Sequence, residues 1–495
     1  MPDFLENFPE VFISSTEISA SVKQALDRGK VKKIGSRLYT KNLVDDPELI
    51  VKRNWYHLLK EYYPDALIAD RTALENKPAE DGSVFIISSK KRNTELPGIV
   101  FKPRKGHGPL NSDRDFVHGT KLSSLPRAYL ENMRRSRARS GVARTLRRDE
   151  LEERLDTYLR NRGEAAVNKL RDDARAISME LDMPEEYQRL DELIGGLFGT
   201  RDAEFVSDAA KARKDGVPFD PDRADLFHQL FETLKETAPH IRPVISQSRE
   251  EKTNLSFFEA YFSNFIEGTE FRVDEAAAII FDHAIPADRP EDAYDVLGTY
   301  RIVSNYEEMS VIPESFDHFI ALLKKRHAIF MELRPDTFPG EFKQKANATG
   351  TIQFVVPDLV IGTLKMGFEI YQGLEEPFHK AVFMMFLVSE VHPFKDGNGR
   401  AARIMMNAEL VAAGEQKMII PTIFRNNYIV ALKALSHNQF ATPIIRTLDF
   451  AQKYTQAVDW SSFESAVSDL NRSNAFMDPV LADHEGIRLR LAGGY

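Results

Sequence analysis

The segment 392–403, His-Pro-Phe-Lys-Asp-Gly-Asn-Gly-Arg-Ala-Ala-Arg, combines residue types that a phosphate-handling site needs. His392 has no cysteine or serine motif nearby and is best interpreted as a general base for an incoming hydroxyl group. Asp396 is a natural Mg²⁺ ligand, because Mg²⁺ prefers one or two carboxylates together with phosphate oxygens. The segment therefore predicts acid–base and phosphate chemistry in one place.

The second half of the segment supplies an anion cradle and its counter-charges. Gly397-Asn398-Gly399 leaves backbone N–H groups open, since glycine takes positive φ readily and has no side chain to block a ligand. Arg400 and Arg403 are spaced to pair with phosphate oxygens at the start of a helix. The alternative is a plain helix–loop–helix turn in which the glycines permit the bend and the charges face solvent.

Two predicted helices position this segment. Residues 377–391 are apolar on most sides, as in a buried helix, and deliver His392 at their end. Pro393 ends that helix. Residues 401–413 form a second helix, which Gly414 stops.

The segment resembles the signature of the Fic family, His-Pro-Phe-x-Asp/Glu-Gly-Asn-Gly-Arg-x-x-Arg, at every specified position. The similar region covers about residues 300–455. The resemblance implies transfer of AMP from ATP to a protein hydroxyl with release of pyrophosphate, and a helical Fic fold. In that family His392 would deprotonate the acceptor hydroxyl and Asp396 would hold Mg²⁺.

The same resemblance assigns the remaining residues of the segment. Gly397, Asn398, Gly399 and Arg400 would hold the α- and β-phosphates, and Arg403 would meet the γ-phosphate. Another nucleotide donor such as UTP stays open, because base choice depends on residues outside the signature.

Residues 350–357 alternate in polarity and resemble the β-hairpin flap of the family, whose backbone pairs with the target segment. An ordinary surface hairpin is the alternative. The flap residues are Thr351, Ile352, Gln353 and Phe354. The adenine pocket is assigned to Asn427 and Tyr428, with a core tyrosine as the alternative for Tyr428.

A segment upstream of the signature resembles the inhibitory motif of the family, Ser/Thr-x-x-x-Glu-Gly/Asn. It runs through Ser263, Glu267 and Gly268. By resemblance Glu267 forms a salt bridge with Arg403 and repels an incoming triphosphate. The alternative is a helix C-terminus with glycine at its end. The same glutamate is also suited to orient a water molecule that hydrolyses the bond between AMP and a modified protein. The sequence does not distinguish this role from inhibition.

Composition limits the class of protein. The chain has 495 residues and a net charge of −9. It contains no cysteine, which excludes disulfides and thiolate metal sites. No secretory signal and no apolar run of membrane-spanning length is visible. We therefore expect a soluble, cytoplasmic protein without a membrane partner.

The N-terminal part has a different charge and pattern from the rest. Residues 1–150 carry 28 Lys and Arg against 20 Asp and Glu, whereas the remainder carries 38 against 55. The first forty residues are expected to form two short helices followed by a two-stranded wing at 31–40, which resembles a winged helix. The arrangement over 1–200 is similar to antitoxins of abortive-infection systems. The predicted DNA-phosphate contacts are Lys23, Arg28, Lys32, Lys33 and Arg37.

The expected fold class is mainly α, a helical Fic domain with a β-hairpin flap preceded by an α+β winged-helix-like module. The expected divisions are a winged-helix-like domain at 1–62, an α+β regulatory domain at 63–215, a helical region with the inhibitory helix at 224–300, the Fic domain at 301–460 and a C-terminal tail at 461–495.

Two functions compete at this point. The first is an autoinhibited protein adenylyltransferase with ATP as substrate, Mg²⁺ as cofactor and a protein hydroxyl as acceptor, with the chain itself among its targets. The second is a DNA-binding regulator of a defence or toxin–antitoxin locus that uses the Fic part as a nucleotide sensor. A homo-oligomer is compatible with both.

Overall fold

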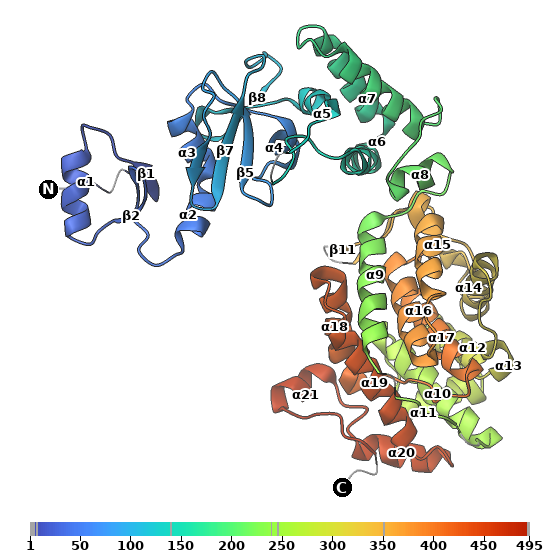
Figure 1. Cartoon of the computed structure of the whole chain (residues 1–495). Coiled ribbons are helices and arrows are strands. Elements are labelled where there is room, and N and C mark those ends of the chain that lie inside the picture. Colours follow the sequence, from blue (N-terminus) through green and yellow to red (C-terminus); the bar gives the residue numbers. More distant parts are fainter. Residues whose placement is uncertain are drawn as a thin grey trace. The chain divides into compact units, whose positions relative to one another are not determined.

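The computed structural model describes residue 5 and residues 8–138, 141–238, 240–244, 247–349 and 352–492. The chain divides into two compact units, Met1–Asp215 and Gly216–Tyr495. Most of the described chain is helical, as predicted, and most strands belong to the first unit (Figure 1).

The first unit begins with a three-stranded antiparallel sheet in the order β1-β3-β2. The two-stranded hairpin predicted at 31–40 is confirmed, because β2 pairs with β3 across a turn at Arg37, whose φ is 58°. The prediction of two helices before it is wrong. Only one helix lies there among the described residues, at 19–27, and the β-branched and aromatic run 11–13 pairs as a strand with β3. The elements are β1 (Val11–Ile13), α1 (Ser19–Asp27), β2 (Lys32–Gly35) and β3 (Leu38–Thr40).

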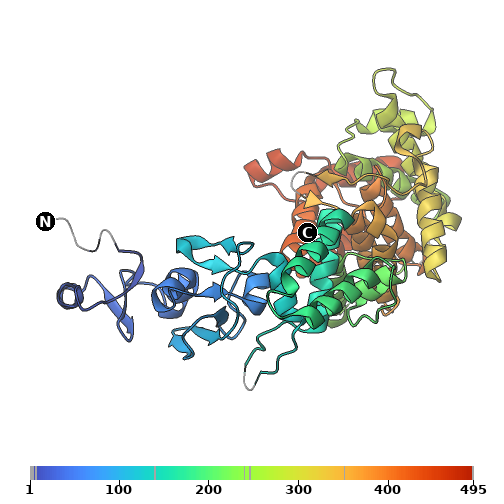
Figure 2. The same ribbon diagram turned by 90° about the horizontal axis from the view of Figure 1, so that it is seen from above.

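A six-stranded mixed sheet follows, in the order β6-β7-β5-β4-β9-β8. β5 is buried along its whole length and lies parallel to β7. Its strands are β4 (Leu67–Ile68), β5 (Ser83–Ile87), β6 (Thr94–Leu96), β7 (Ile99–Arg104), β8 (Arg114–Asp115) and β9 (Lys121–Leu122). The strands can be followed side by side in Figure 1 and, turned, in Figure 2.

Helices complete the first unit. α6 changes direction at Gly163, whose φ of 77° is outside the helical region. The helices are α2 (Pro47–Arg53), α3 (Trp55–Tyr62), α4 (Asp70–Glu75), α5 (Leu125–Met133), α6 (Arg148–Ser178), α7 (Pro184–Leu197) and α8 (Asp208–Lys214).

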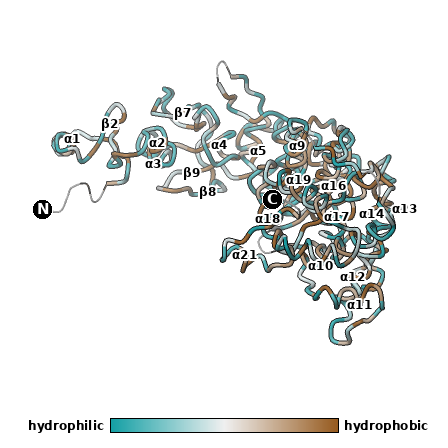
Figure 3. Tube along the Cα trace, turned by 90° about the horizontal axis from the view of Figure 1, so that it is seen from below, coloured by the Kyte–Doolittle hydropathy of each residue, from teal (hydrophilic) through white to brown (hydrophobic). Residues whose placement is uncertain are grey.

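The second unit is a helical bundle around α16. Every residue from Ala381 to Val388 is buried, so α16 is surrounded by other helices, as its uniformly apolar sequence predicts. In Figure 1 α9, α15 and α17 lie beside it. Along the other helices hydrophobic and hydrophilic stretches alternate (Figure 3). The elements are α9 (Pro221–Glu236), α10 (Arg249–Ile266), α11 (Val273–Phe281), α12 (Pro290–Val303), α13 (Tyr306–Met309), α14 (Phe316–Phe330), β10 (Ala348–Thr349), β11 (Ile352–Gln353), α15 (Val360–Tyr371), α16 (Pro377–Val391), α17 (Asn398–Ala412), α18 (Arg425–Asn438) and α19 (Thr442–Ala457).

The segment expected to be a tail folds into α20 (Phe463–Arg472) and α21 (Pro479–Glu485). It packs against α10. The Phe258 ring stacks on the Phe463 ring at 5.5 Å, and the Phe262 ring lies 5.5 Å from that of Phe476. Phe463 and Phe476 therefore belong to the core that holds α10 in place.

Within the described residues, no helix has both the length and the hydrophobicity to cross a bilayer.

Candidate active site

His392 lies at the end of α16, as the sequence predicts. Its backbone takes the left-handed region, with φ 53° and ψ 58°, and its N–H donates to the Val388 carbonyl at 3.1 Å. Its side-chain Nδ1 lies 3.2 Å from the Ser389 carbonyl oxygen. A carbonyl can only accept, so Nδ1 carries the proton and Nε2 is left to accept one.

The loop after His392 is closed by its own asparagine. The Asn398 side chain accepts a hydrogen bond from the Phe394 N–H at 2.8 Å and donates to the Phe394 carbonyl at 2.9 Å. The Asn398 side chain therefore fixes the loop, and only its backbone would be open to the predicted anion.

The second helix begins earlier than predicted, at Asn398 rather than residue 401. Gly397 takes φ 74° as its N-cap, which brings the asparagine and Gly399 into the first turn. No side chain caps this helix by a hydrogen bond, so the N–H groups of its first turn are directed at whatever lies beyond the helix end. Asp396 is exposed, and one of its oxygens accepts from the Gly397 N–H at 2.6 Å.

Glu267, at the C-terminal end of α10, lies in this anion cradle. Its Oε1 accepts from Nη2 of Arg403 at 2.7 Å. A Cβ built on Gly399 would lie only 2.2 Å from the same carboxylate oxygen. The glutamate therefore lies against the glycine backbone, and the cradle already holds an anion, the chain's own carboxylate.

Ser263 completes the hold on Arg403. Its hydroxyl accepts from Nε at 2.9 Å and its carbonyl accepts from Nη2 at 2.8 Å. Gly268 follows with φ 97°, a conformation that ends α10 and lets the chain turn away. The predicted motif residues and Arg403 are thus brought together in one contact.

Arg400 is also paired, and sequence reasoning missed its partner. Its Nη1 lies 2.9 Å from Oδ1 of Asp295 on α12, and the side chain is almost completely buried. Asp295 also contacts Nη1 of Arg334 at 3.1 Å. Nε of Arg400 is buried without a hydrogen-bond partner among the described residues, which leaves a donor for a bound anion. No local pattern marks Asp295, since it is one carboxylate on a long helix.

His327, on α14, is a second missed residue. Its Nε2 lies 3.0 Å from the Asp396 carbonyl, and its Nδ1 accepts from the Gly340 N–H at 2.9 Å. Its ring stacks on Phe394 at 3.7 Å. Burial lowers the pKa of His327 to about 4, so it stays neutral and acts as a fixed support under the signature loop.

The predicted flap is a two-stranded antiparallel hairpin of β10 and β11. Thr351 lies outside the described residues. Ile352 and Gln353 form β11, and the Phe354 ring stacks on the His392 ring with 3.7 Å between centroids and 7° between planes. The hairpin therefore reaches His392.

The two residues assigned to the adenine pocket point into different surroundings. Tyr428 is buried and its hydroxyl contacts the Met385 sulfur at 3.3 Å, which agrees with the core alternative. Asn427 lines a separate cavity of about 170 Å³ next to α21, together with Phe424 and Phe450. Their role in binding a base stays a prediction.

All five residues predicted to contact DNA are exposed: Lys23, Arg28, Lys32, Lys33 and Arg37. The arginine-rich stretch that follows α5 is different, because most of its described members are paired. Arg134 contacts Glu186, Arg144 contacts Asp70, and Arg147 and Arg148 contact Asp149 and Glu152. That stretch is therefore neutralised within its own unit.

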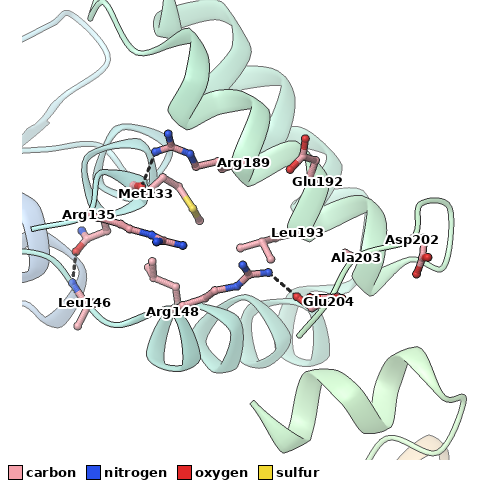
Figure 4. A pocket seen from close by; sticks show the side chains of 12 residues that line it. Met133, Arg135, Leu146, Arg148, Arg189, Glu192, Leu193, Asp202, Ala203 and Glu204 are labelled. Carbon is pink, nitrogen blue, oxygen red and sulfur yellow. Dashed lines mark hydrogen bonds between the residues drawn. The ribbon is translucent and has the colours of Figure 1, made fainter. Parts of the chain in front are cut away.

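A cavity of about 350 Å³ lies between α5, α6 and α7 (Figure 4). Hydrophobic side chains such as Met133 and Leu193 form part of its wall, and the Arg135 guanidinium points into it. Its lining holds equal numbers of acidic and basic residues. The charges that line this cavity therefore do not indicate whether a ligand would be an anion or a cation.

No cluster of three or more histidine and acidic side chains suited to a metal occurs in the described residues. Asp396 alone fits a site in which the phosphates of a nucleotide supply most of the oxygen ligands. Such a site would be completed only by the substrate.

Comparison with known proteins agrees with the signature. Residues 317–410 match the model of the Fic/DOC family. Among its relatives is the protein adenylyltransferase Fic of Drosophila mojavensis, 25% identical over 224 residues that cover 44% of each chain. The corresponding protein of Drosophila melanogaster is 25% identical over 253 residues, which cover 48% of this chain and 51% of that one. The chain spans about half the length of these curated relatives.

Similar solved structures are also Fic proteins. A Fic domain containing signaling protein from Bacteroides thetaiotaomicron covers 50% of this chain and 97% of its own, at 15% identity and a TM-score of 0.36. Fic-1 from C. elegans covers 69% of this chain and 96% of its own, at 16% identity and a TM-score of 0.35.

Proposed function

We propose that this chain is a protein adenylyltransferase whose resting state is inhibited by Glu267. The observation that carries the proposal is the position of that carboxylate, 2.7 Å from Arg403 and directly over Gly399. A site that holds a carboxylate between an arginine and a helix N-terminus has the electrostatics to hold a phosphate. The relatives named protein adenylyltransferase support ATP as the phosphate-bearing substrate.

The reaction follows from the residues around His392. Nε2 accepts the proton of the acceptor hydroxyl, whose oxygen attacks the α-phosphorus of ATP. The bond from that phosphorus to the bridging oxygen breaks, so AMP is joined to the acceptor and pyrophosphate leaves. Arg400 and the N–H groups of Asn398 and Gly399 stabilise the phosphate charge during the transfer. Asp396 would hold Mg²⁺, which neutralises phosphate charge when bound.

Inhibition follows from competition for one arginine. While Glu267 holds Arg403, that arginine is not available to the γ-phosphate, and the carboxylate repels the triphosphate. Removal of AMP by a water molecule oriented on Glu267 is a further reaction that the same position allows. A protein acceptor agrees with the solved complex of a Fic protein covalently tethered to Cdc42, a relative at 15% identity.

The test is incorporation of adenine-labelled ATP into protein by the full chain and two variants. We expect Glu267→Gly to raise self-modification by about tenfold or more, and His392→Ala to reduce it by about 10²–10⁴-fold. Equal incorporation by the wild-type chain and Glu267→Gly would exclude inhibition by Glu267. Equal incorporation by Glu267→Gly with and without His392 would exclude His392 as the base.

We propose DNA binding as a second function of the N-terminal module, supported by the exposure of its five basic residues. Binding through phosphate contacts weakens steeply as salt rises. Gel shifts with promoter DNA across a salt series test this, and no retardation at low salt would exclude it. Retardation that changes with ATP, without AMP incorporation, would favour the regulator over the enzyme.

A further inference from the structure

The face of His392 is covered by the flap residue Phe354. The two rings are almost parallel, with centroids 3.7 Å apart and 7° between their planes. The Ser389 carbonyl fixes Nδ1 on one edge of the imidazole. The ring is therefore held at one face and one edge, while Nε2 keeps its direction.

Phe354 is anchored on the side of the signature loop through Asn347. Its backbone N–H donates to the Asn347 carbonyl at 3.2 Å, and the Asn347 side chain donates to the Phe394 carbonyl at 3.0 Å. Nζ of Lys343 donates to the Asn347 side chain at 2.6 Å and lies 6.0 Å from the Phe354 ring centre. These contacts tie the aromatic ring to the loop that carries the histidine.

A second anchor comes from α9, outside the stretch that matches the family model. Arg223 donates to the Gln353 carbonyl at 2.9 Å and lies 3.0 Å from the Glu390 carboxylate. Glu390 is itself part of α16, two residues before the histidine. The strand before Phe354 is thus fastened to the helix that delivers His392.

The surroundings of His392 keep it neutral. Burial, together with the positive charge of Lys343, lowers its pKa to about 4, although the Ser389 carbonyl, Glu267 and Asp396 act in the opposite direction. A histidine with a lowered pKa binds no proton at neutral pH and is ready to accept one. The Phe354 ring is one of the groups that exclude water from it.

We propose that Phe354 is the positioning residue for the base: its ring fixes the plane of the His392 imidazole and keeps it dry and unprotonated. This inference deepens the proposed function and rests on it for its kinetic consequences. The acceptor hydroxyl then approaches Nε2 in the plane of the imidazole, with the stacked pair intact. The alternative is that the Phe354 ring blocks His392, so that an acceptor must displace the ring before it can react.

The first test follows protonation of His392 without any reaction. In full-length protein labelled at histidine, the NMR signal of His392 is the one lost in His392→Ala. We expect it to show no titration between pH 5.5 and 7.5 in the wild-type chain and in Phe354→Tyr. In Phe354→Ala it should titrate within that range, toward the ordinary value of about 6.5. Equal titration curves in wild type and Phe354→Ala would overturn the inference.

The second test is kinetic and uses the Glu267→Gly background. Phe354→Ala should lower kcat for AMP transfer at pH 7 by about tenfold, with the KM for ATP unchanged, because Phe354 touches the base and not the cradle. Phe354→Tyr should restore kcat, and Phe354→Leu, which is apolar but cannot stack, should not. A rise in kcat with Phe354→Ala would show that the ring blocks His392 and would overturn the inference.

The two tests distinguish failure of the proposed function from failure of the role proposed for Phe354. No AMP incorporation by any variant, together with a shifted titration in Phe354→Ala, would reject the proposed function and keep the role of Phe354 in holding the imidazole. Incorporation that depends on His392, together with unchanged titration and unchanged kcat in Phe354→Ala, would reject only the inference.

Discussion

Two of the elements that contact the signature, α10 and the flap, are held in different ways. α10 contacts it through ionic and polar groups, and both faces of that helix are buried. The flap contacts His392 through the Phe354 ring, and its strands are two residues long. A short strand pair contributes little stability by itself, whereas a buried helix moves only with the core around it.

The polar face of α10 is fixed by a buried ion pair one turn before the inhibitory motif. Glu259 accepts from Nζ of Lys417 and from the Asn407 side chain, each at 2.8 Å. Glu267, in contrast, keeps about a third of its side chain exposed at the end of the same helix. Under the proposed inhibition, we therefore expect release by movement of the Glu267 side chain, while α10 stays in place.

The largest expected effect concerns this anchor. Glu259→Gln removes the partner of Lys417, whose side chain is 2% exposed, and leaves that charge uncompensated in the core. We expect the free energy of unfolding to fall by about 3–5 kcal/mol. Glu267→Gln on the same helix should lower it by less than about 1 kcal/mol, because that pair is partly exposed. Chemical denaturation followed by circular dichroism measures both.

A matched double variant controls for the loss of charge itself. Glu259→Met together with Lys417→Met removes both ions and should recover much of the stability lost in Glu259→Gln. Equal destabilisation by Glu259→Gln and Glu267→Gln would contradict the distinction between the firmly held helix α10 and the more weakly held Glu267 side chain.

The sequence predicts the parts of the site whose local pattern carries the information. The proline after His392, the glycine N-cap of α17 and the motif at Ser263 and Glu267 depend on neighbours within a few residues. Glycine, proline and the position of a residue at a helix end restrict the backbone directly, so the mounting of the histidine and of the cradle could be predicted.

The residues that hold the site in place from other helices make contacts between distant segments. These contacts leave no local pattern in the sequence. Asp295 and His327 are single residues on helices that otherwise look ordinary, and Arg223 lies far upstream of the flap. The first turn of α17 was missed for a related reason. Gly397-Asn398-Gly399 is typical of a loop, but the asparagine side chain folds back on Phe394 and allows the helix to begin there.

A smaller effect is expected on nucleotide affinity. Glu267→Gln removes the negative charge that occupies Arg403, so ATP should bind about tenfold more tightly, about 1.4 kcal/mol. AMP, which cannot reach that arginine with a γ-phosphate, should bind equally well to both proteins. Isothermal titration calorimetry with both nucleotides measures this. An equal gain for AMP would show that the carboxylate acts on the whole cradle and not on Arg403.

The smallest effect concerns the flap itself. Arg223→Lys keeps a positive charge beside Glu390 but loses the planar guanidinium that reaches the Gln353 carbonyl. Loss of one such hydrogen bond corresponds to about 0.5–1.5 kcal/mol, so amide hydrogen exchange in residues 352–356 should accelerate about two- to tenfold. Exchange in α10 should be slow and unchanged in the same protein, which provides the internal control. Peptides from the two regions, followed by mass spectrometry, would show this directly. If α10 exchanged as fast as the flap, the helix that carries Glu267 would be as weakly held as the hairpin. Movement of the whole of α10, rather than of the Glu267 side chain, would then be the expected way to relieve inhibition.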